Sequence, residues 1–112
     1  MNSAIDIDAR IADADSEFPA LFQLFGGYFH QDWREDYATT AAALTAFIEE
    51  APPEAVREAA VELQRLLDLP VDDEALSKLL RMGFDCNYVP GQDGLTATQW
   101  LTAVRDRLQP GG

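Results

Sequence analysis

The stretch FPALFQLFGGYFHQDWREDY, from Phe18 to Tyr37, decides the fold of this chain. Its apolar residues recur at helical spacing and make a face wide enough for a helix that is surrounded by others. Pro19 suits the first turn of a helix, where its missing N–H costs nothing. We therefore expect a central helix from Pro19 to about Phe29. Its core-facing residues are Phe18, Leu21, Phe22, Leu24, Phe25, Tyr28 and Phe29.

The second half of this stretch turns polar after a glycine pair. Glycine inside a helix costs about 1 kcal/mol relative to alanine. Gly26 and Gly27 thus indicate a helix end, a bend, or a place where another backbone comes close. Trp33 and Tyr37 are too large to leave in water without a reason. We expect them to pack on the core, with a role as binding anchors as the alternative.

The length and charge of the chain restrict its class. Its 112 residues predict one domain, and the single cysteine, Cys86, excludes an internal disulfide and fits a reducing compartment. No signal peptide and no membrane-spanning stretch is recognisable, so we expect a soluble cytoplasmic protein. The net charge of −12 would repel nucleic acid and anionic membranes, so we expect neither as a partner. It favours a basic protein partner, with solubility alone as the alternative.

Four more helices are predicted after the central one. One begins at Thr39 or Thr40 and ends before Pro52, and the others cover about 53–67, 72–83 and 96–108. No strand pattern is evident. The prediction is an all-α, single-domain bundle of about five helices over residues 18–108, followed by a tail at 109–112. Residues 1–17 form an acidic N-terminal arm, either a short amphipathic helix or, as we favour, a loosely packed segment.

Two groups of acidic residues are candidate binding surfaces. The first follows the central helix, and the second lies at four-residue intervals on the expected outer side of the 53–67 helix. A plain solvated face is the alternative for the second group, and Arg57 and Arg65 relieve part of its repulsion. The candidate residues are Asp32, Glu35 and Asp36 in the first group, and Glu54, Glu58 and Glu62 in the second.

Catalytic chemistry has little support in the sequence. Cys86 has no nucleophile motif around it, and the spacing of His30, Asp32 and Asp36 is not diagnostic of a metal site. No glycine-rich phosphate loop or zinc-protease motif is found. We therefore expect no catalytic residue, no metal and no cofactor.

The segment GGYFHQDW, from Gly26 to Trp33, resembles a signature of the immunity proteins of bacterial contact-dependent growth inhibition systems, a family of small all-α proteins. The similarity extends from about Phe18 to Leu108, through the break at Pro70 and the turn from Tyr88 to Gly91. The residues that carry the signature are Gly26, Gly27, Tyr28, Phe29, His30 and Trp33.

The resemblance implies a protein that binds the toxin domain delivered by a sibling cell and blocks it by occlusion, without catalysis. Such toxins are often nucleases, whose active faces are basic because they attract a polyanion. A net charge of −12 suits such a partner. We expect the six acidic residues to contact the toxin and the signature residues to maintain the fold. An acidic adaptor or nucleic-acid mimic, and a small metal-dependent hydrolase, are the alternatives. We expect a monomer, and a dimer stays open.

Overall fold

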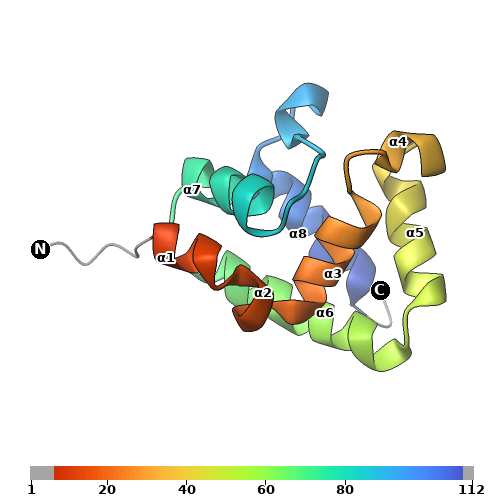
Figure 1. Ribbon diagram of the computed structural model, residues 1–112, viewed down its shortest axis with the longest axis horizontal. Coiled ribbons are helices and arrows are strands. Elements are labelled where there is room, and N and C mark those ends of the chain that lie inside the picture. Colours follow the sequence, from red (N-terminus) through yellow and green to blue (C-terminus); the bar gives the residue numbers. More distant parts are fainter. Residues whose placement is uncertain (1–6, 110–112) are drawn as a thin grey trace, which may run out of the picture.

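The computed structural model describes residues 7–109, and every regular element within that range is helical (Figure 1). The predicted all-α, single-domain class is confirmed. The predicted helices correspond to α3, α5, α6, α7 with its continuation η1, and α8. The elements are α1 (Ile7–Ala12), α2 (Ala14–Glu17), α3 (Pro19–Tyr28), α4 (Trp33–Asp36), α5 (Thr40–Glu50), α6 (Pro53–Leu67), α7 (Asp73–Lys78), the π-helix η1 (Leu79–Gly83), the 3-10 helix η2 (Pro90–Asp93) and α8 (Ala97–Leu108).

The central helix α3 lies among the other helices, as its wide apolar face predicts (Figure 1). Phe25 is fully buried, and its ring centroid lies 5.6 Å from those of both Phe84 and Trp100. Phe29 is also fully buried and meets the Trp100 ring edge-on at 5.4 Å. Aromatic pairs at such distances add about 0.5–1.5 kcal/mol each beyond the area they bury. Phe22 differs from the prediction, because 37% of its surface is exposed.

Side-chain caps fix the helix starts that the sequence predicts. The Thr39 hydroxyl accepts the N–H of Ala42 at 3.0 Å, so α5 begins at Thr40. At α8, Thr96 and Gln99 form the expected capping box. Each such cap contributes about 1 kcal/mol of stability. Local chemistry therefore accounts for where these helices begin.

The two glycines of the signature differ in their surroundings. A Cβ atom on Gly26 would lie 3.2 Å from the backbone oxygen of Phe84, whereas one on Gly27 would meet nothing within 4 Å. Of the three roles that the sequence left open, Gly26 has the close approach of another backbone. The segment after Gly83 therefore packs directly on α3.

The N-terminal arm differs from the favoured prediction. Residues 7–17 form α1 and α2, and Ala14 is fully buried. A Cβ atom on Gly83 would lie 3.2 Å from the Ala14 Cβ, so α2 packs closely against η1. Arg10 pairs with Glu17. A loosely packed segment is therefore wrong for residues 7–17. The first six residues of the arm and the last three of the tail lie outside the described residues.

Glu62 differs from its predicted outward position. Only 7% of this residue is exposed, and its Oε1 accepts the N–H of Ala20 at 2.9 Å and of Leu21 at 3.0 Å. The carboxylate thus satisfies donors in the first turn of α3, which has no cap from its own segment. Burial raises the pKa of the Glu62 carboxyl, and the two N–H donors offset part of that rise. Its expected place on the outer side of α6 is wrong.

Asp73 has a similar role between α7 and α8. Its carboxylate accepts the N–H and hydroxyl of Thr98 at 2.8 and 2.9 Å and the N–H of Ala97 at 3.3 Å. Burial alone would raise the pKa of Asp73, but these donors to the charged form lower it overall. Carboxylates from other helices therefore fix the starts of both α3 and α8.

Among the described helices, none combines the length and apolar character that crossing a bilayer requires.

Candidate partner-binding surface

The first predicted acidic group lies together on the surface, on and just before the short helix α4. Asp32, Glu35 and Asp36 are all exposed. The helix between them is held by Trp33, which is only 4% exposed and packs against Phe29 at 5.4 Å. Trp33 fills the core side of α4, and the three carboxylates stay at the surface. The burial of Trp33 agrees with the expected core packing.

His30 links this acidic group to the end of α3. Its Nδ1 accepts the N–H of Asp32 at 3.0 Å, and its Nε2 lies 3.2 Å from Asp36 Oδ2. Since Nδ1 is an acceptor, Nε2 is the N–H donor of the hydrogen bond to the Asp36 carboxylate. The side chain therefore holds the polar connection between α3 and α4 in one shape.

Two tyrosines extend the acidic surface toward α5. The rings of Tyr28 and Tyr37 stack with centroids 6.2 Å apart, and the Tyr28 hydroxyl donates to Glu50 Oε1 at 2.9 Å. Burial, and then the hydrogen bond to Glu50, raise the pKa of Tyr28 to about 12. Burial and the charges of Glu50 and Asp36 raise the pKa of Tyr37. Both phenols thus stay protonated beside the carboxylates at neutral pH.

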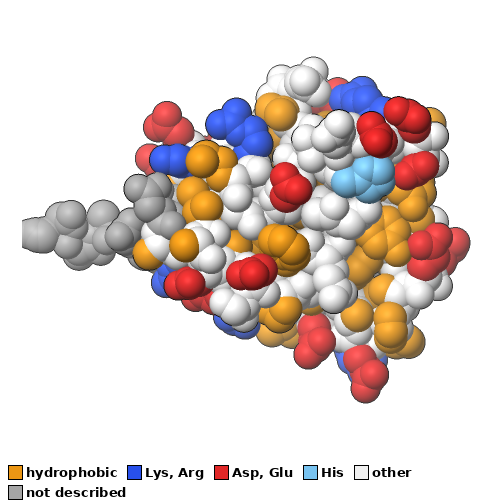
Figure 2. Space-filling model, in the orientation of Figure 1, with side chains coloured by type: hydrophobic (Ala, Val, Ile, Leu, Met, Phe, Trp, Pro, Cys, Tyr) orange, Lys and Arg blue, Asp and Glu red, His pale blue; other side chains and the backbone are white. Residues whose placement is uncertain are grey.

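These contacts define one continuous region, which we call the acidic–tyrosine patch. Figure 2 shows red acidic side chains next to the pale blue histidine, in the region of α4, with orange hydrophobic surface beside them. Arg34, a basic residue of α4, lies over the Trp33 ring at 4.9 Å and donates to Gln92 at 3.1 Å. The residues of the patch are Tyr28, His30, Asp32, Glu35, Asp36, Tyr37 and Glu50.

The second predicted group is divided by the fold. Glu54 and Glu58 are exposed on α6, whereas Glu62 faces α3. Arg57 and Arg65 line the same shallow depression of about 680 Å³ as these two exposed carboxylates. Glu62 also lines this depression, so three carboxyl groups and two guanidinium groups share it, and the arginines offset most of the negative charge. The structure thus brings together the first group and leaves the second without a strong negative field.

The structure also shows the surroundings of Cys86 and of the residues that could bind a metal ion. Cys86 is buried, its Sγ lies 3.6 Å from the carbonyl oxygen of Tyr88, and burial raises the pKa of the thiol to about 12. A thiol that stays protonated is a poor nucleophile at neutral pH. Among the side chains that the structure describes, no three from His, Cys, Asp or Glu are grouped in a way that could hold a metal ion.

Sequence reasoning missed Glu50 and the stacking of the two tyrosines. Glu50 lies 22 residues after Tyr28, its hydrogen-bond partner. The only local sign is that it ends α5, just before Ala51 and Pro52. Pairing α3 with α5 is a property of the folded bundle, so no local spacing reveals it.

The fold and this surface define a small all-α protein with an acidic, aromatic-lined binding face. Comparison with known proteins then gives its family. The sequence model of the CdiI immunity protein family matches residues 17–108, so the chain belongs to this family and is an immunity protein. Among curated proteins, none matches the sequence.

A solved structure shares the fold. A chain in the crystal structure of the CdiA-CT/CdiI complex from Y. kristensenii 33638 is similar with a TM-score of 0.79 and 23% sequence identity. The similarity covers 84% of this chain and 100% of that chain. The two chains therefore share the same arrangement of helices.

Proposed function

We propose that this immunity protein binds the basic active face of a nuclease-type toxin domain through the acidic–tyrosine patch and blocks it by occlusion. The observation that carries the proposal is the meeting of exposed carboxylates with a stacked tyrosine pair on one surface. In the described part of the chain, the carboxylates of Asp32 and Glu35 make no ion pair, so they are available to cations from a partner. A cytoplasmic location and the absence of catalysis are parts of this proposal.

The charge of the patch supports a basic partner. Asp32, Glu35, Asp36 and Glu50 contribute four negative charges, and Arg34, a basic residue of α4, contributes one positive charge. Such a field steers a positively charged protein and raises its association rate. Nuclease active faces are positive because their substrate is a polyanion. The related crystal structure is one of a CdiA-CT/CdiI complex, which also favours a protein partner.

The tyrosines supply what charge alone does not. Binding energy concentrates in a few aromatic or arginine side chains at the centre of an interface, and tyrosine is enriched among them. Tyr28 and Tyr37 are partly exposed and already held by stacking and by the bond to Glu50. Little side-chain freedom is then lost when a partner covers them. Glu54 and Glu58 are left out of the proposed interface, because arginines offset most of the negative charge on that face.

The proposal is tested with the toxin domain encoded next to this protein's gene. Replacing Asp32, Glu35 and Asp36 by lysine should lower the association rate by roughly tenfold or more, because steering depends on local charge. A matched control replaces Asp13, Asp15 and Glu74, exposed acids on other elements, by lysine with the same change in net charge. Surface plasmon resonance gives both rates.

Two outcomes overturn the proposal. Equal loss of association rate in both triple variants means that total charge, and not the patch, governs binding. Full protection of toxin-expressing cells by the Asp32/Glu35/Asp36 variant places the interface elsewhere. The nuclease part has its own readout: the isolated toxin domain should cleave RNA or DNA, and adding this protein should stop the cleavage.

A further inference from the structure

The imidazole of His30, the single histidine of the chain, bridges the two ends of the short helix α4. Its Nδ1 accepts the backbone N–H of Asp32, the residue before α4, and its Nε2 donates to the carboxylate of Asp36, the last residue of α4. The backbone oxygen of His30 also accepts the N–H of Trp33 at 3.0 Å. One residue just after α3 therefore holds α4 at three points.

Only one form of the imidazole makes both side-chain contacts. The neutral ring with its proton on Nε2 accepts at Nδ1 and donates at Nε2. A second proton would occupy Nδ1, where the N–H of Asp32 already points, so two donors would face each other. The contact to Asp32 would be lost, whereas the contact to Asp36 would join opposite charges and become stronger. Proton uptake thus releases the start of α4 and tightens the hold on its end.

We propose that His30 is a positioning residue of the acidic–tyrosine patch, and that its protonation weakens the binding of the toxin domain. This inference rests on the proposed function, because it concerns the same surface. The neutral imidazole holds Asp32 and Asp36 in one arrangement without adding charge. The imidazolium releases Asp32 and adds one positive charge to a surface that attracts a basic partner. Affinity for the toxin domain is therefore highest where the imidazole is neutral, and it falls as the pH is lowered toward 5.

The other titratable groups near this connection belong to classes that ordinarily change charge outside this pH range. Histidine ordinarily changes charge between pH 5 and 8, whereas carboxyl groups do so below pH 5. Burial and neighbouring carboxylates raise the pKa values of Tyr28 and Tyr37. Arg34 lies over the Trp33 ring and keeps its charge throughout. Acids on the adjoining segments include Asp32, Glu35 and Asp36 beside His30, Glu50 on α5, and Asp85 on the segment whose Asn87 N–H donates to the Phe29 oxygen.

The position of the imidazole makes the change reversible and limited in extent. The side chain of His30 is 38% exposed, so protons from solvent reach it directly. On the core side, Trp33 packs against Phe29 and Tyr88 and makes no contact that depends on the imidazole proton. Helix α4 therefore stays folded, and only its outer connection is rearranged. The loss of one hydrogen bond and the gain of one charge change an affinity by roughly threefold to tenfold.

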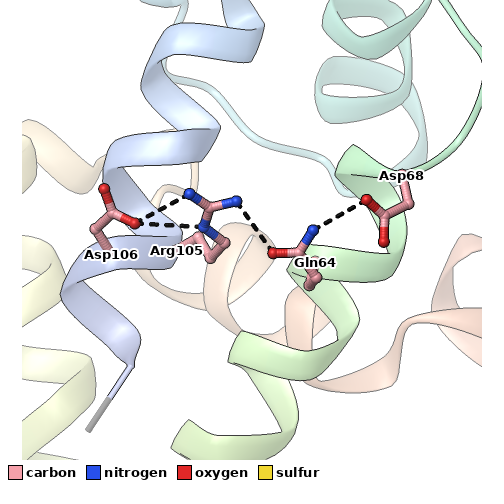
Figure 3. A network of polar contacts seen from close by, with 4 residues as sticks. All are labelled: Gln64, Asp68, Arg105 and Asp106. Carbon is pink, nitrogen blue, oxygen red and sulfur yellow. Dashed lines mark hydrogen bonds and ion pairs between the residues drawn. The ribbon is translucent and has the colours of Figure 1, made fainter. Parts of the chain in front are cut away.

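Nuclear magnetic resonance of the free full chain tests the first step without the toxin. Nitrogen shifts at pH 8 should show the proton of His30 on Nε2, and lowering the pH to 5 should move the Asp32 amide signal with the midpoint of the imidazole signals. The side-chain amide of Gln64 is the internal reference. Figure 3 shows Gln64 between Arg105 of α8 and Asp68: it accepts from Arg105 Nη1 at 3.0 Å and donates to Asp68 Oδ1 at 3.0 Å. No histidine takes part in these contacts, so the Gln64 signal should not follow that midpoint.

The affinity for the toxin domain, measured from pH 8 to pH 5.5, tests the second step. The matched variant is His30→Asn, which keeps an acceptor oxygen for the Asp32 N–H and cannot gain a charge. Over this range the unaltered protein should lose roughly threefold to tenfold more affinity than the variant. Titrating groups of the toxin and the α-amino group of this chain act on both proteins, so the ratio of dissociation constants isolates His30. At pH 8, His30→Asn should bind nearly as well as the unaltered protein, whereas His30→Ala, which keeps neither contact, should bind more weakly.

Each step has an outcome that overturns it. A proton on Nδ1 at pH 8, or an Asp32 amide signal that does not follow the imidazole, removes the positioning role. Equal loss of affinity in the unaltered protein and His30→Asn removes the effect on the toxin. The proposed function fails by a different result, full protection by the Asp32/Glu35/Asp36 lysine variant, and the resonance measurement on the free chain does not depend on that result. Far-UV circular dichroism confirms that each variant keeps its helices.

Discussion

The Glu62 carboxylate of α6 lies 3.0 Å from the backbone nitrogen of Leu21, 41 residues earlier in the chain, and joins two helices at the start of α3. Glu62→Ala would leave two buried N–H groups without a partner. An unsatisfied buried donor costs about 1–3 kcal/mol. We expect this variant to lose about that much unfolding free energy in urea titrations. Glu62→Gln keeps an acceptor oxygen and should lose much less. Equal losses would contradict the capping role.

The raised pKa of Glu62 has a consequence for the pH dependence of stability. A carboxyl whose pKa is higher in the folded than in the unfolded state binds more protons when folded. Its contribution is therefore fully present below the ordinary pKa of glutamate, near 4.5, and is lost as pH rises through the folded pKa. Compared with Glu62→Gln, the unaltered protein should gain unfolding free energy between pH 7 and pH 4. Urea titrations of both proteins at each pH measure the difference in their unfolding free energies. If the unaltered protein instead loses stability relative to Glu62→Gln as the pH is lowered, the raised pKa is contradicted.

The glycine pair offers a matched test of packing. Alanine is about 1 kcal/mol better than glycine inside a helix. Gly27→Ala meets no atom within 4 Å and should gain up to that amount. Gly26→Ala would bring its Cβ to 3.2 Å from the Phe84 carbonyl, so it should gain nothing or lose stability. Thermal unfolding of the two variants ranks them, and a stability gain in Gly26→Ala equal to that in Gly27→Ala would show that the approach of Phe84 imposes no constraint.

Titration of the tyrosines tests the hydrogen bond within the acidic–tyrosine patch. All three tyrosines, Tyr28, Tyr37 and Tyr88, have pKa values raised above the ordinary 10.0, and that of Tyr28 reaches about 12. Ultraviolet absorbance should therefore show less than half of the tyrosines ionised at pH 10. Glu50→Gln removes a charge next to Tyr28 and should lower its pKa. An identical titration curve for Glu50→Gln would contradict the contact, with circular dichroism excluding alkaline unfolding.

Much of the fold is predictable because its signals are local. The apolar spacing predicts α3, and the capping side chains of Thr39 and Thr96 mark where α5 and α8 begin. The carboxylates that bind the first turns of α3 and α8 from other helices have no such local signal. Close packing between small residues is harder to predict from the sequence. The fit of Ala14 against Gly83 orders α2, although residues 1–17 hold few large apolar side chains. The π-helix η1 also has no periodic signature that distinguishes it from the end of α7.

The sequence predicts the exposure of the first acidic group correctly but not that of the second, and the reason is geometric. Four residues advance a helix by about 40°, so Glu62 lies about 80° around α6 from Glu54. A row of acids spaced by four therefore turns from the outer side toward the core within two steps. The exposure of Asp32, Glu35 and Asp36 is easier to predict, because Trp33 determines which side of α4 points inward. Contacts such as Tyr28 with Glu50 depend on how helices pack, which spacing along one segment does not describe.

The buried position of Trp33 between exposed neighbours makes α4 an exchangeable unit. The indole packs against Phe29 and Tyr88, with ring centroids 5.4 and 5.8 Å away. Asp32, Arg34 and Glu35 on either side are exposed. Trp33 is the one buried side chain of this four-residue helix, so its exposed positions can accept new residues without new core packing. If the proposed interface is right, we expect that substitutions at these positions redesign the specificity for a partner, while the rest of the chain keeps its packing.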